Sequence, residues 1–332
     1  MLDQPTESEA RAFIGSLGLR FEPCDELVGL YENGQLVACG ARAGYVLKML
    51  AIAPSHQGSD ALGTLVTRLI LSGLAAGHET LFVFTLPQNV ASFEALNFRM
   101  LATHGTAALL EHGPGLDAYL ASHAGQITPG RNGAIVLNGN PFTLGHRHLV
   151  ELAVRQVDHL FVFVVSEDCS VFPFAVRFRL AVAATAHLSR VTVLETSRYS
   201  VSAGTFPSYF LKRLDEASVA QMNIDLQLFA RRIAPAFHIA CRFVGQEPLC
   251  PTTAAYNRTM AEVLAASAIQ TVEVPRLEAG GAPVSASRVR AALTAGEVGT
   301  LEMLVPPSTL AFLRSPAAQT IIESLRTSLK GA

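Results

Sequence analysis

Five short apolar runs in the second half of the chain limit the folds that it can adopt. They are rich in β-branched and aromatic residues, and a helix-sized stretch separates most of them: AIVL (134–137), LFVFVV (160–165), VTVL (191–194), IACRFV (239–244) and TVEV (271–274). Such strands, alternating with helices, are typical of a parallel sheet that is covered on both faces. Ligands of these sheets bind at the carboxyl ends of the strands, so the loops that follow the five runs are the candidate sites.

Length and composition indicate a globular protein of more than one domain. The chain has 332 residues, of which 50% are hydrophobic and 16% are charged, which favours large buried cores over disorder. The net charge of −2 argues against a nucleic-acid surface built on bulk charge. The five cysteines are scattered without a C-x-x-C pair, and neither a secretory signal nor a membrane-spanning run is visible. We therefore expect a soluble, cytoplasmic protein.

We expect two domains joined by a linker. Residues 1–124 combine helices with early strands, including a hairpin turn at Asn33-Gly34, which predicts an α+β unit. Residues 125–133 hold three glycines and a proline without periodicity, and we interpret them as the linker. Residues 134–332 then contain the parallel sheet, so the predicted fold class is α/β.

The loop after the first apolar run, in LNGNPFTLGHRHLVELA (137–153), places a hydroxyl, a glycine and an imidazole at the start of a helix. Thr143 and His146 can hydrogen-bond phosphate oxygens beside the positive end of that helix. Gly145 lets a nucleotide lie against the backbone. A histidine here stabilises charge that develops on a phosphate as pyrophosphate leaves. A capped helix with an incidental histidine is the alternative, since T-x-G-H is a short pattern.

A second stretch, PVSASRVRAALTAGE (283–297), follows the last apolar run and also starts a helix. Ser285 or Ser287 is expected to cap it, and its first turn holds Arg288 and Arg290. Cations are unfavourable near the positive end of a helix dipole, so their presence favours a bound polyanion. A surface helix with two solvated arginines is the alternative.

Together the two stretches resemble the nucleotidylyltransferase superfamily, whose T/H-x-G-H and I-S-S-T-like motifs bind ATP. Four longer runs resemble the citrate lyase ligase family: NGNPFTLGHRHLVE (138–151), TFPSYFLKRLD (205–215), RFVGQEPLCPTTAAYN (242–257) and VPRLEAGGAPVSASRVR (274–290). The resemblance implies a ligase that adenylates acetate with ATP and Mg²⁺, passes the acetyl group to a thiol, and releases AMP and pyrophosphate. The implied acceptor is the CoA-like prosthetic group on the acyl carrier subunit of citrate lyase.

The resemblance also implies roles for individual residues. The implied ATP-binding residues are Asn138, Asn140, Pro141, Phe142, Thr143, Gly145, His146, Gly245, Glu247, Ser285, Ser287 and Arg288. Of these, Thr143 and His146 are expected to be catalytic, together with Lys212. Lys212, near Tyr209, would neutralise the acetate carboxylate or the α-phosphate, because adenylation joins two anions that repel each other. A solvated helix lysine is the alternative. No metal-ligand cluster is visible, which agrees with an ion held by nucleotide and water.

The first domain resembles the GNAT acetyltransferase fold through VLKMLAIAPSHQGSDALGTLVTRLI (46–70) and PQNVASFEALNFRML (87–101). That fold wraps the pyrophosphate of acetyl-CoA in a Q/R-x-x-G-x-G/A loop, and here Asp60 and Leu62 replace the two glycines. Aspartate repels a pyrophosphate and leucine crowds it. Three roles therefore stay open: a working transferase, a holder of the carrier's CoA-like arm, or a scaffold.

Two other functions fit part of the pattern. Another adenylyltransferase, acting on a phosphorylated precursor such as phosphopantetheine, would share the T-x-G-H site. A non-catalytic module that senses nucleotide or acyl-CoA is the second, although a sensor has no need for the imidazole of His146. Acetate-dependent exchange between pyrophosphate and ATP distinguishes these classes from the ligase.

Overall fold

The computed structural model describes residues 1–167, 170–200, 214–247 and 251–328, and the chain divides into two compact units. The first consists of Met1–Ser122 with Val201–Leu228, and the second of His123–Ser200 with Phe229–Ala332. We expected one domain over 134–332, and in the structure the described residues 214–228 group with the first unit. The reason is that α7 (Leu214–Leu228) packs against β6 (Arg99–His104) and β7 (Ala107–His112) of the first unit.

The first unit is built on a seven-stranded sheet with the order β1-β2-β3-β4-β5-β7-β6. Neighbouring strands are antiparallel, except that β4 and β5 are parallel. The remaining strands are β1 (Leu2–Asp3), β2 (Glu26–Glu32), β3 (Gln35–Ala43), β4 (Val46–Ile52) and β5 (Leu81–Thr85). The predicted hairpin is confirmed, since Asn33 and Gly34 join β2 to β3 with φ angles of 50° and 79°. A two-residue turn of this kind matches the twist of the strands.

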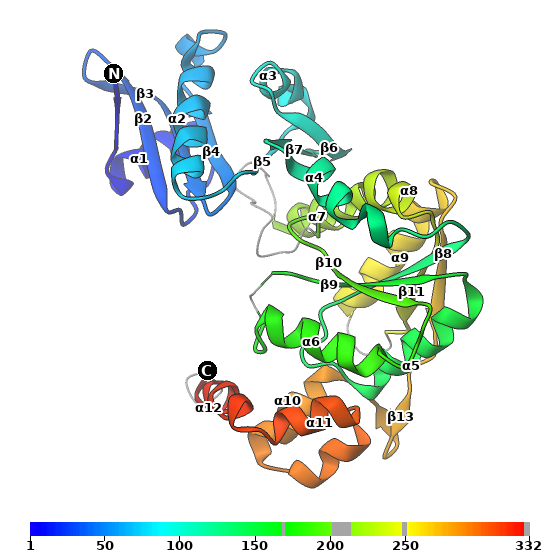
Figure 1. The fold of residues 1–332 in the computed structure, drawn as a ribbon. Helices are drawn as coiled ribbons and strands as arrows, with labels where there is room; N and C mark the ends of the chain where they lie inside the picture. The colour runs from blue at the N-terminus through cyan, green and yellow to red at the C-terminus, as the bar shows by residue number, and fades with distance from the viewer. Residues whose placement is uncertain (168–169, 201–213, 248–250, 329–332) are drawn as a thin grey trace. The chain divides into compact units, whose positions relative to one another are not determined.

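Helices cover both faces of this sheet (Figure 1). Ile14 of α1 (Glu7–Ser16) packs with Cys39 and Met49 on one face. Leu65 and Leu69 of α2 (Ala61–Ala75) pack with Leu47 on the other. The short helices α3 (Val90–Glu94) and α4 (Gly115–His123) also belong to this part of the chain. The α+β architecture predicted for this part of the chain is confirmed.

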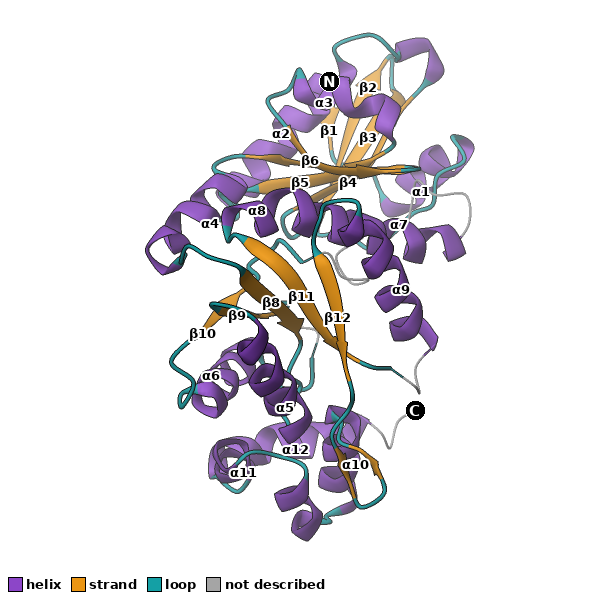
Figure 2. Ribbon diagram, turned by 90° about the vertical axis from the view of Figure 1, so that its right-hand side faces the viewer, coloured by secondary structure: helices purple, strands orange, loops and turns teal. Residues whose placement is uncertain are grey.

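The second unit contains the predicted parallel sheet, with the strand order β10-β9-β8-β11-β12 (Figure 2). Its strands are β8 (Asn132–Leu137), β9 (Leu160–Val164), β10 (Val191–Glu195), β11 (Ile239–Gly245) and β12 (Gln270–Val274). All five coincide with the apolar runs to within two residues. The expected linker at 125–133 is partly structured, because a 3-10 turn covers Ala124–Gln126 and β8 already begins at Asn132.

Two layers of helices cover this sheet. One core joins the sheet to α5 (Leu144–Ala153), α6 (Phe174–Thr185), α10 (Ala286–Ala295), α11 (Pro307–Leu313) and α12 (Pro316–Ser328). Cys241 and Phe243 of β11 belong to that core. Arg242 between them contacts Tyr256 of α9 (Pro251–Ala265), so α9 lies on the opposite face. The remaining described elements are a π-helical turn (Phe229–Ile233), α8 (Ala234–Ala236), β13 (Glu278–Ala279), β14 (Ala282–Pro283) and two 3-10 helices (Val154–Gln156 and Val298–Met303).

Candidate active site

The site begins at the carboxyl end of β8, where the chain turns into α5. Thr143 is the N-cap of this helix, and its Oγ1 accepts a hydrogen bond from the backbone N–H of His146 over 3.3 Å. In return, Nδ1 of His146 accepts from the backbone N–H of Thr143 over 3.0 Å. Helix capping of this reciprocal kind requires residues three apart. The spacing within T-x-G-H therefore has a structural cause that is independent of any ligand.

The same cap determines which nitrogen of His146 carries the proton. Because Nδ1 accepts from a backbone N–H, the proton of the neutral ring is on Nε2. Burial, and secondarily the positive charge of Arg276, lower the pKa of His146 to about 4. The ring is therefore neutral near pH 7. It offers one hydrogen-bond donor at Nε2.

The second motif meets the first at Gly145. A Cβ atom on this residue would lie 2.9 Å from the backbone oxygen of Val284, so glycine allows the two segments to approach this closely. Next to Val284, Ser285 caps α10 by accepting from the backbone N–H of Arg288 over 3.2 Å. The predicted contact of Gly145 with a nucleotide stays a prediction. The structure adds a packing reason for the same glycine.

The two arginines of α10 hold backbone segments in place. Arg288 donates from Nη1 to the backbone oxygens of residues 279, 282 and 283, over 3.1, 2.8 and 3.0 Å. Arg290 donates to the backbone oxygen of Asn140 over 2.6 Å and to Oγ of Ser287 over 3.2 Å. Arg290 thus ties α10 to the loop after β8, whereas Arg288 fixes the β13–β14 hairpin.

A cavity of about 590 Å³ opens where β8 and β11 separate. The two strands pair only from Asn132 to Ala134 of β8, although β8 continues to Leu137 and β11 to Gly245. The strand order reverses between β8 and β11, and α/β sheets bind ligands at such a point. The predicted residues that line the cavity are Asn138, Thr143, Gly145, His146, Gly245, Glu247, Ser285 and Ser287.

Other predicted residues lie outside the cavity lining: Asn140, Pro141, Phe142 and Arg288. Asn140 accepts from the backbone N–H of Phe172 through Oδ1 over 3.0 Å, and from Arg290 through its backbone oxygen. Phe142 is fully buried, and its ring centroid lies 5.3 Å from that of His146. Asn140 and Phe142 thus support the loop after β8 from the side that does not line the cavity. Lys212 and Tyr209 lie outside the described residues.

Arg276 is a cavity residue outside the predicted set. It follows β12, and its Nη2 forms an ion pair with Oε2 of Glu247. Its Nε donates to the backbone oxygen of Gln246 over 2.5 Å. The pair joins the loops after β11 and β12, and both loops were among those expected to carry the site. Only their position after a strand could have pointed to Arg276.

A second unpredicted arginine supports the loops from inside the unit. Arg177 of α6 is fully buried and donates to the backbone oxygens of Asn138, Val165, Glu167 and Phe172 over 2.7–2.9 Å. These oxygens belong to the loops after β8 and β9. A buried arginine that holds four carbonyl groups fixes the loop after β9 against the loop after β8, whose Asn138 lines the cavity. No pattern around Arg177 in the sequence marks this role.

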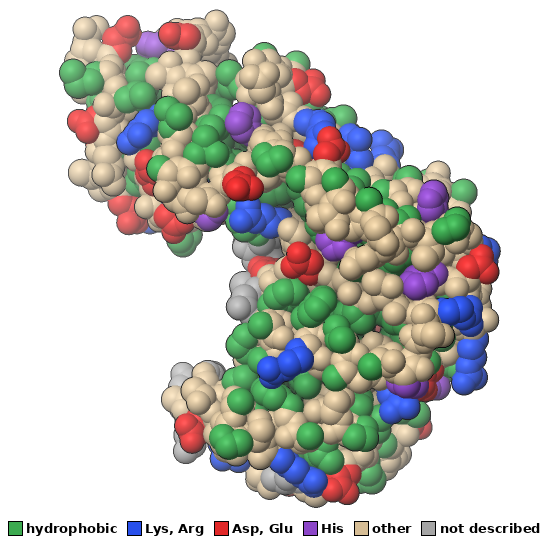
Figure 3. All heavy atoms as spheres, in the orientation of Figure 1, with side chains coloured by type: hydrophobic (Ala, Val, Ile, Leu, Met, Phe, Trp, Pro, Cys, Tyr) green, Lys and Arg blue, Asp and Glu red, His purple; other side chains and the backbone are tan. Residues whose placement is uncertain are grey.

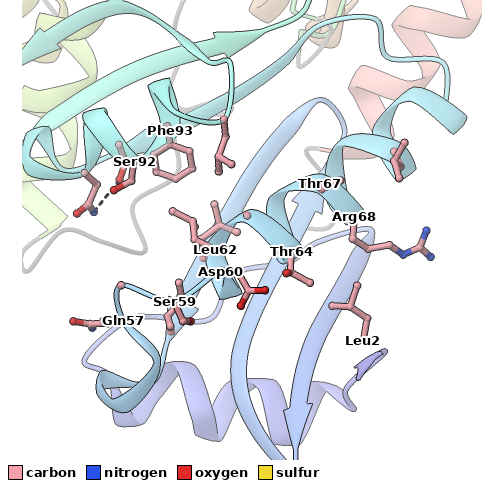
Figure 4. A pocket seen from close by; sticks show the side chains of 18 residues that line it. Leu2, Gln57, Ser59, Asp60, Leu62, Thr64, Thr67, Arg68, Ser92 and Phe93 are labelled. Atoms are coloured by element: carbon pink, nitrogen blue, oxygen red, sulfur yellow. Dashed lines mark hydrogen bonds between the residues drawn. The ribbon is translucent and has the colours of Figure 1, made fainter.

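The first unit has a cavity of its own, of about 1100 Å³. Ser59 and Asp60 lie at the start of α2 on one side, and Phe93 of α3 lies across from them (Figure 4). The side chain of Asp60 makes no capping hydrogen bond with α2, and Leu62 also lines the cavity. The two residues that replace the motif glycines thus both face this space.

A metal centre and a membrane-spanning helix find no support in the parts of the chain that the structure describes. No group of three or more His, Cys, Asp or Glu side chains there is placed to hold a metal ion. None of the described helices combines the length and the hydropathy of a transmembrane segment. Charged side chains of both signs are scattered over the face in Figure 3, without a continuous basic surface among the residues described on that face.

Comparison with known proteins adds a family relationship. Residues 132–313 match the family described as the citrate lyase ligase C-terminal domain. A citrate (pro-3S)-lyase ligase from Klebsiella pneumoniae is 43% identical over 94% of this chain and 93% of its own length. A protein of the same name from Escherichia coli is 38% identical over 86% of this chain and 83% of its own. An N-acetyltransferase structure from Staphylococcus aureus covers 34% of this chain and 97% of its own, with 15% identity and a TM-score of 0.29.

Proposed function

Because this chain belongs to the citrate lyase ligase family, we propose that it activates acetate with ATP and acetylates the acyl carrier subunit of citrate lyase. AMP and pyrophosphate are the other products. One observation carries the proposal. The capped starts of α5 and α10 and the neutral imidazole of His146 border one cavity at the switch point of a parallel sheet.

In the first step, a carboxylate oxygen of acetate attacks the α-phosphorus of ATP in line. A bond from phosphorus to the acyl oxygen forms, the bond to the β-phosphate oxygen breaks, and pyrophosphate leaves with the electron pair. The Nε2–H of His146 donates a hydrogen bond to a phosphate oxygen on which negative charge increases. A neutral donor suits this task, because no proton has to be transferred for pyrophosphate to leave.

The nucleotide enters as its Mg²⁺ complex, and the ion belongs to the substrate. Mg²⁺ is held mainly by phosphate oxygens and water in such complexes, and it offsets the charge of the phosphates. Glu247 is the acidic side chain in the described lining of the cavity, and its carboxylate is paired with Arg276. The residues present therefore suit an ion that the nucleotide carries in.

In the second step, the thiol of the CoA-like prosthetic group loses its proton to solvent and attacks the acyl carbon as a thiolate. A thioester bond forms, the bond between the acyl carbon and the phosphate oxygen breaks, and AMP leaves. A thiol acceptor requires reducing conditions, and Cys24, Cys39 and Cys241 of this chain are free thiols. On this basis we place the protein in the cytoplasm.

The test is acetate-dependent exchange of labelled pyrophosphate into ATP, with purified protein, Mg²⁺ and no carrier. Exchange that requires acetate is the expected result, because the adenylation step is reversible. Exchange that requires phosphopantetheine instead of acetate would identify another adenylyltransferase. Binding of ATP without exchange for any acid, with or without the carrier subunit, would contradict the proposal and favour a sensor.

A further inference from the structure

Arg242 lies at the point where the cavity of the second unit begins. It is the last residue of β11 that pairs with β8, and the strands separate beyond it. The residue is 3% exposed and lines the cavity. Arg242 therefore forms part of the wall at the inner end of the cavity.

The guanidinium group of Arg242 is incompletely paired. Nη2 donates to the hydroxyl of Tyr256 over 3.3 Å, and the guanidinium carbon lies 4.4 Å from the centroid of the Phe229 ring. Nε and Nη1 are buried and have no hydrogen-bond acceptor among the described residues. A buried cation without a counter-ion is costly, so this arrangement is stabilised when an anion binds beside it.

The other arginines around the site are engaged within the protein. Arg276 pairs with Glu247, Arg288 and Arg290 donate to backbone oxygens, and Arg177 donates to four of them. Among the described arginines of the cavity lining, Arg242 therefore has the greatest capacity left for a ligand.

We infer that Arg242 binds the carboxylate of the acid substrate; this inference rests on the proposed function. The starts of α5 and α10 border the cavity on one face of the sheet, and these are the groups expected to take phosphates. Arg242 projects from the other face, toward Tyr256 of α9. A carboxylate beside it would approach the nucleotide from the side opposite to the phosphate-binding groups.

This placement also addresses the main electrostatic obstacle to adenylation. Acetate and a triphosphate repel each other, and a fixed positive charge beside the carboxylate reduces that repulsion. One carboxylate oxygen stays on the guanidinium while the other attacks phosphorus, and the electron pair leaves on pyrophosphate. Met260 of α9 also lines the cavity and provides an apolar surface for the short carbon chain of the acid.

The test compares Michaelis constants of Arg242→Gln and of the wild type in the pyrophosphate exchange assay. Loss of a charged hydrogen-bond donor predicts a rise of about 10–100-fold in the KM for acetate, with the KM for ATP nearly unchanged. Arg242→Lys keeps the charge, and an intermediate KM for acetate is expected. Arg131→Gln is the matched control, because Arg131 lies outside the cavity lining and donates to Gln156, Cys241 and Gln270.

Two results would overturn the inference. A rise in the KM for ATP with an unchanged KM for acetate would assign Arg242 to the nucleotide phosphates. Unchanged constants in both variants would make the residue structural. If Arg242→Gln does not fold, Arg242→Lys alone decides the question through the same comparison of the two constants.

A binding measurement separates this inference from the proposed function. Line broadening of ¹³C-acetate is recorded with the wild type and with Arg242→Lys, each in the presence of α,β-methylene-ATP, which cannot release pyrophosphate. If the ¹³C-acetate signal is broadened less by Arg242→Lys than by the wild type, the inference is supported even if neither protein exchanges pyrophosphate into ATP. Exchange in the wild type with equal broadening in both proteins would support the function and overturn the role of Arg242.

Discussion

Replacement of His146 tests the centre of the proposed mechanism. His146→Ala removes the Nε2–H donor from the cavity, together with the acceptor for the backbone N–H of Thr143. Loss of one preorganised donor to developing charge lowers turnover by about 10²–10³-fold, or roughly 2.7–4 kcal/mol. Loss of the capping contact costs about 1 kcal/mol of folding stability. The expected variant is therefore folded and slow.

The pH dependence examines the charge of the ring separately. With a pKa of about 4, roughly 1% of His146 is protonated at pH 6, whereas an ordinary histidine with a pKa near 6.5 would be roughly 75% protonated. Titration of His146 should therefore not change the exchange rate between pH 8 and pH 6. The folded-state pKa lies below the ordinary value, so its contribution to stability is present above about pH 6.5. That contribution is lost as the pH falls toward 4.

The assay is acetate-dependent exchange from pH 5.5 to 8.5, with folding monitored by circular dichroism. His146→Gln, whose amide N–H can replace the Nε2 donor, should recover part of the lost rate. His187→Ala is the control, because this exposed histidine is bound only to Glu151 among the contacts described. A wild-type rate in His146→Ala would remove the ring from the mechanism. A wild-type rate loss near pH 6.5 that is absent from His146→Gln would refute the neutral-donor argument.

Three further substitutions test the supporting structure. Gly145→Ala should lower the free energy of unfolding, measured with urea, by about 1–3 kcal/mol, because its Cβ would press on the backbone oxygen of Val284. Gly125→Ala is the control, since the space around Gly125 is open. Equal losses in the two variants would contradict the packing argument. Arg177→Met leaves buried carbonyl groups unpaired and should lower the free energy of unfolding by at least about 3 kcal/mol. A loss below about 1 kcal/mol in the same measurement would refute the supporting role of Arg177. Asp60→Gly should raise the affinity for CoA in a calorimetric titration if the first-unit loop wraps a pyrophosphate, and an unchanged affinity would favour the scaffold role.

Features that depend on neighbours along the chain could be predicted from the residue order alone. The five apolar runs predicted the parallel strands, because buried strands need continuous apolar residues. The Asn33-Gly34 turn and the caps at Thr143 and Ser285 involve residues at most three apart. Their geometry is fixed by local backbone conformation, which the residue types dictate.

Tertiary structure decided which of several similar side chains take part in the site. Arg288 and Arg290 are two residues apart in the same helix, yet Arg290 reaches Asn140, 150 residues away along the chain, and Arg288 binds its own hairpin. Arg242 was not among the predicted site residues, and its place at the inner end of the cavity follows from the separation of β8 and β11. Such contacts depend on the packing of distant segments, and a local pattern carries no information about that packing.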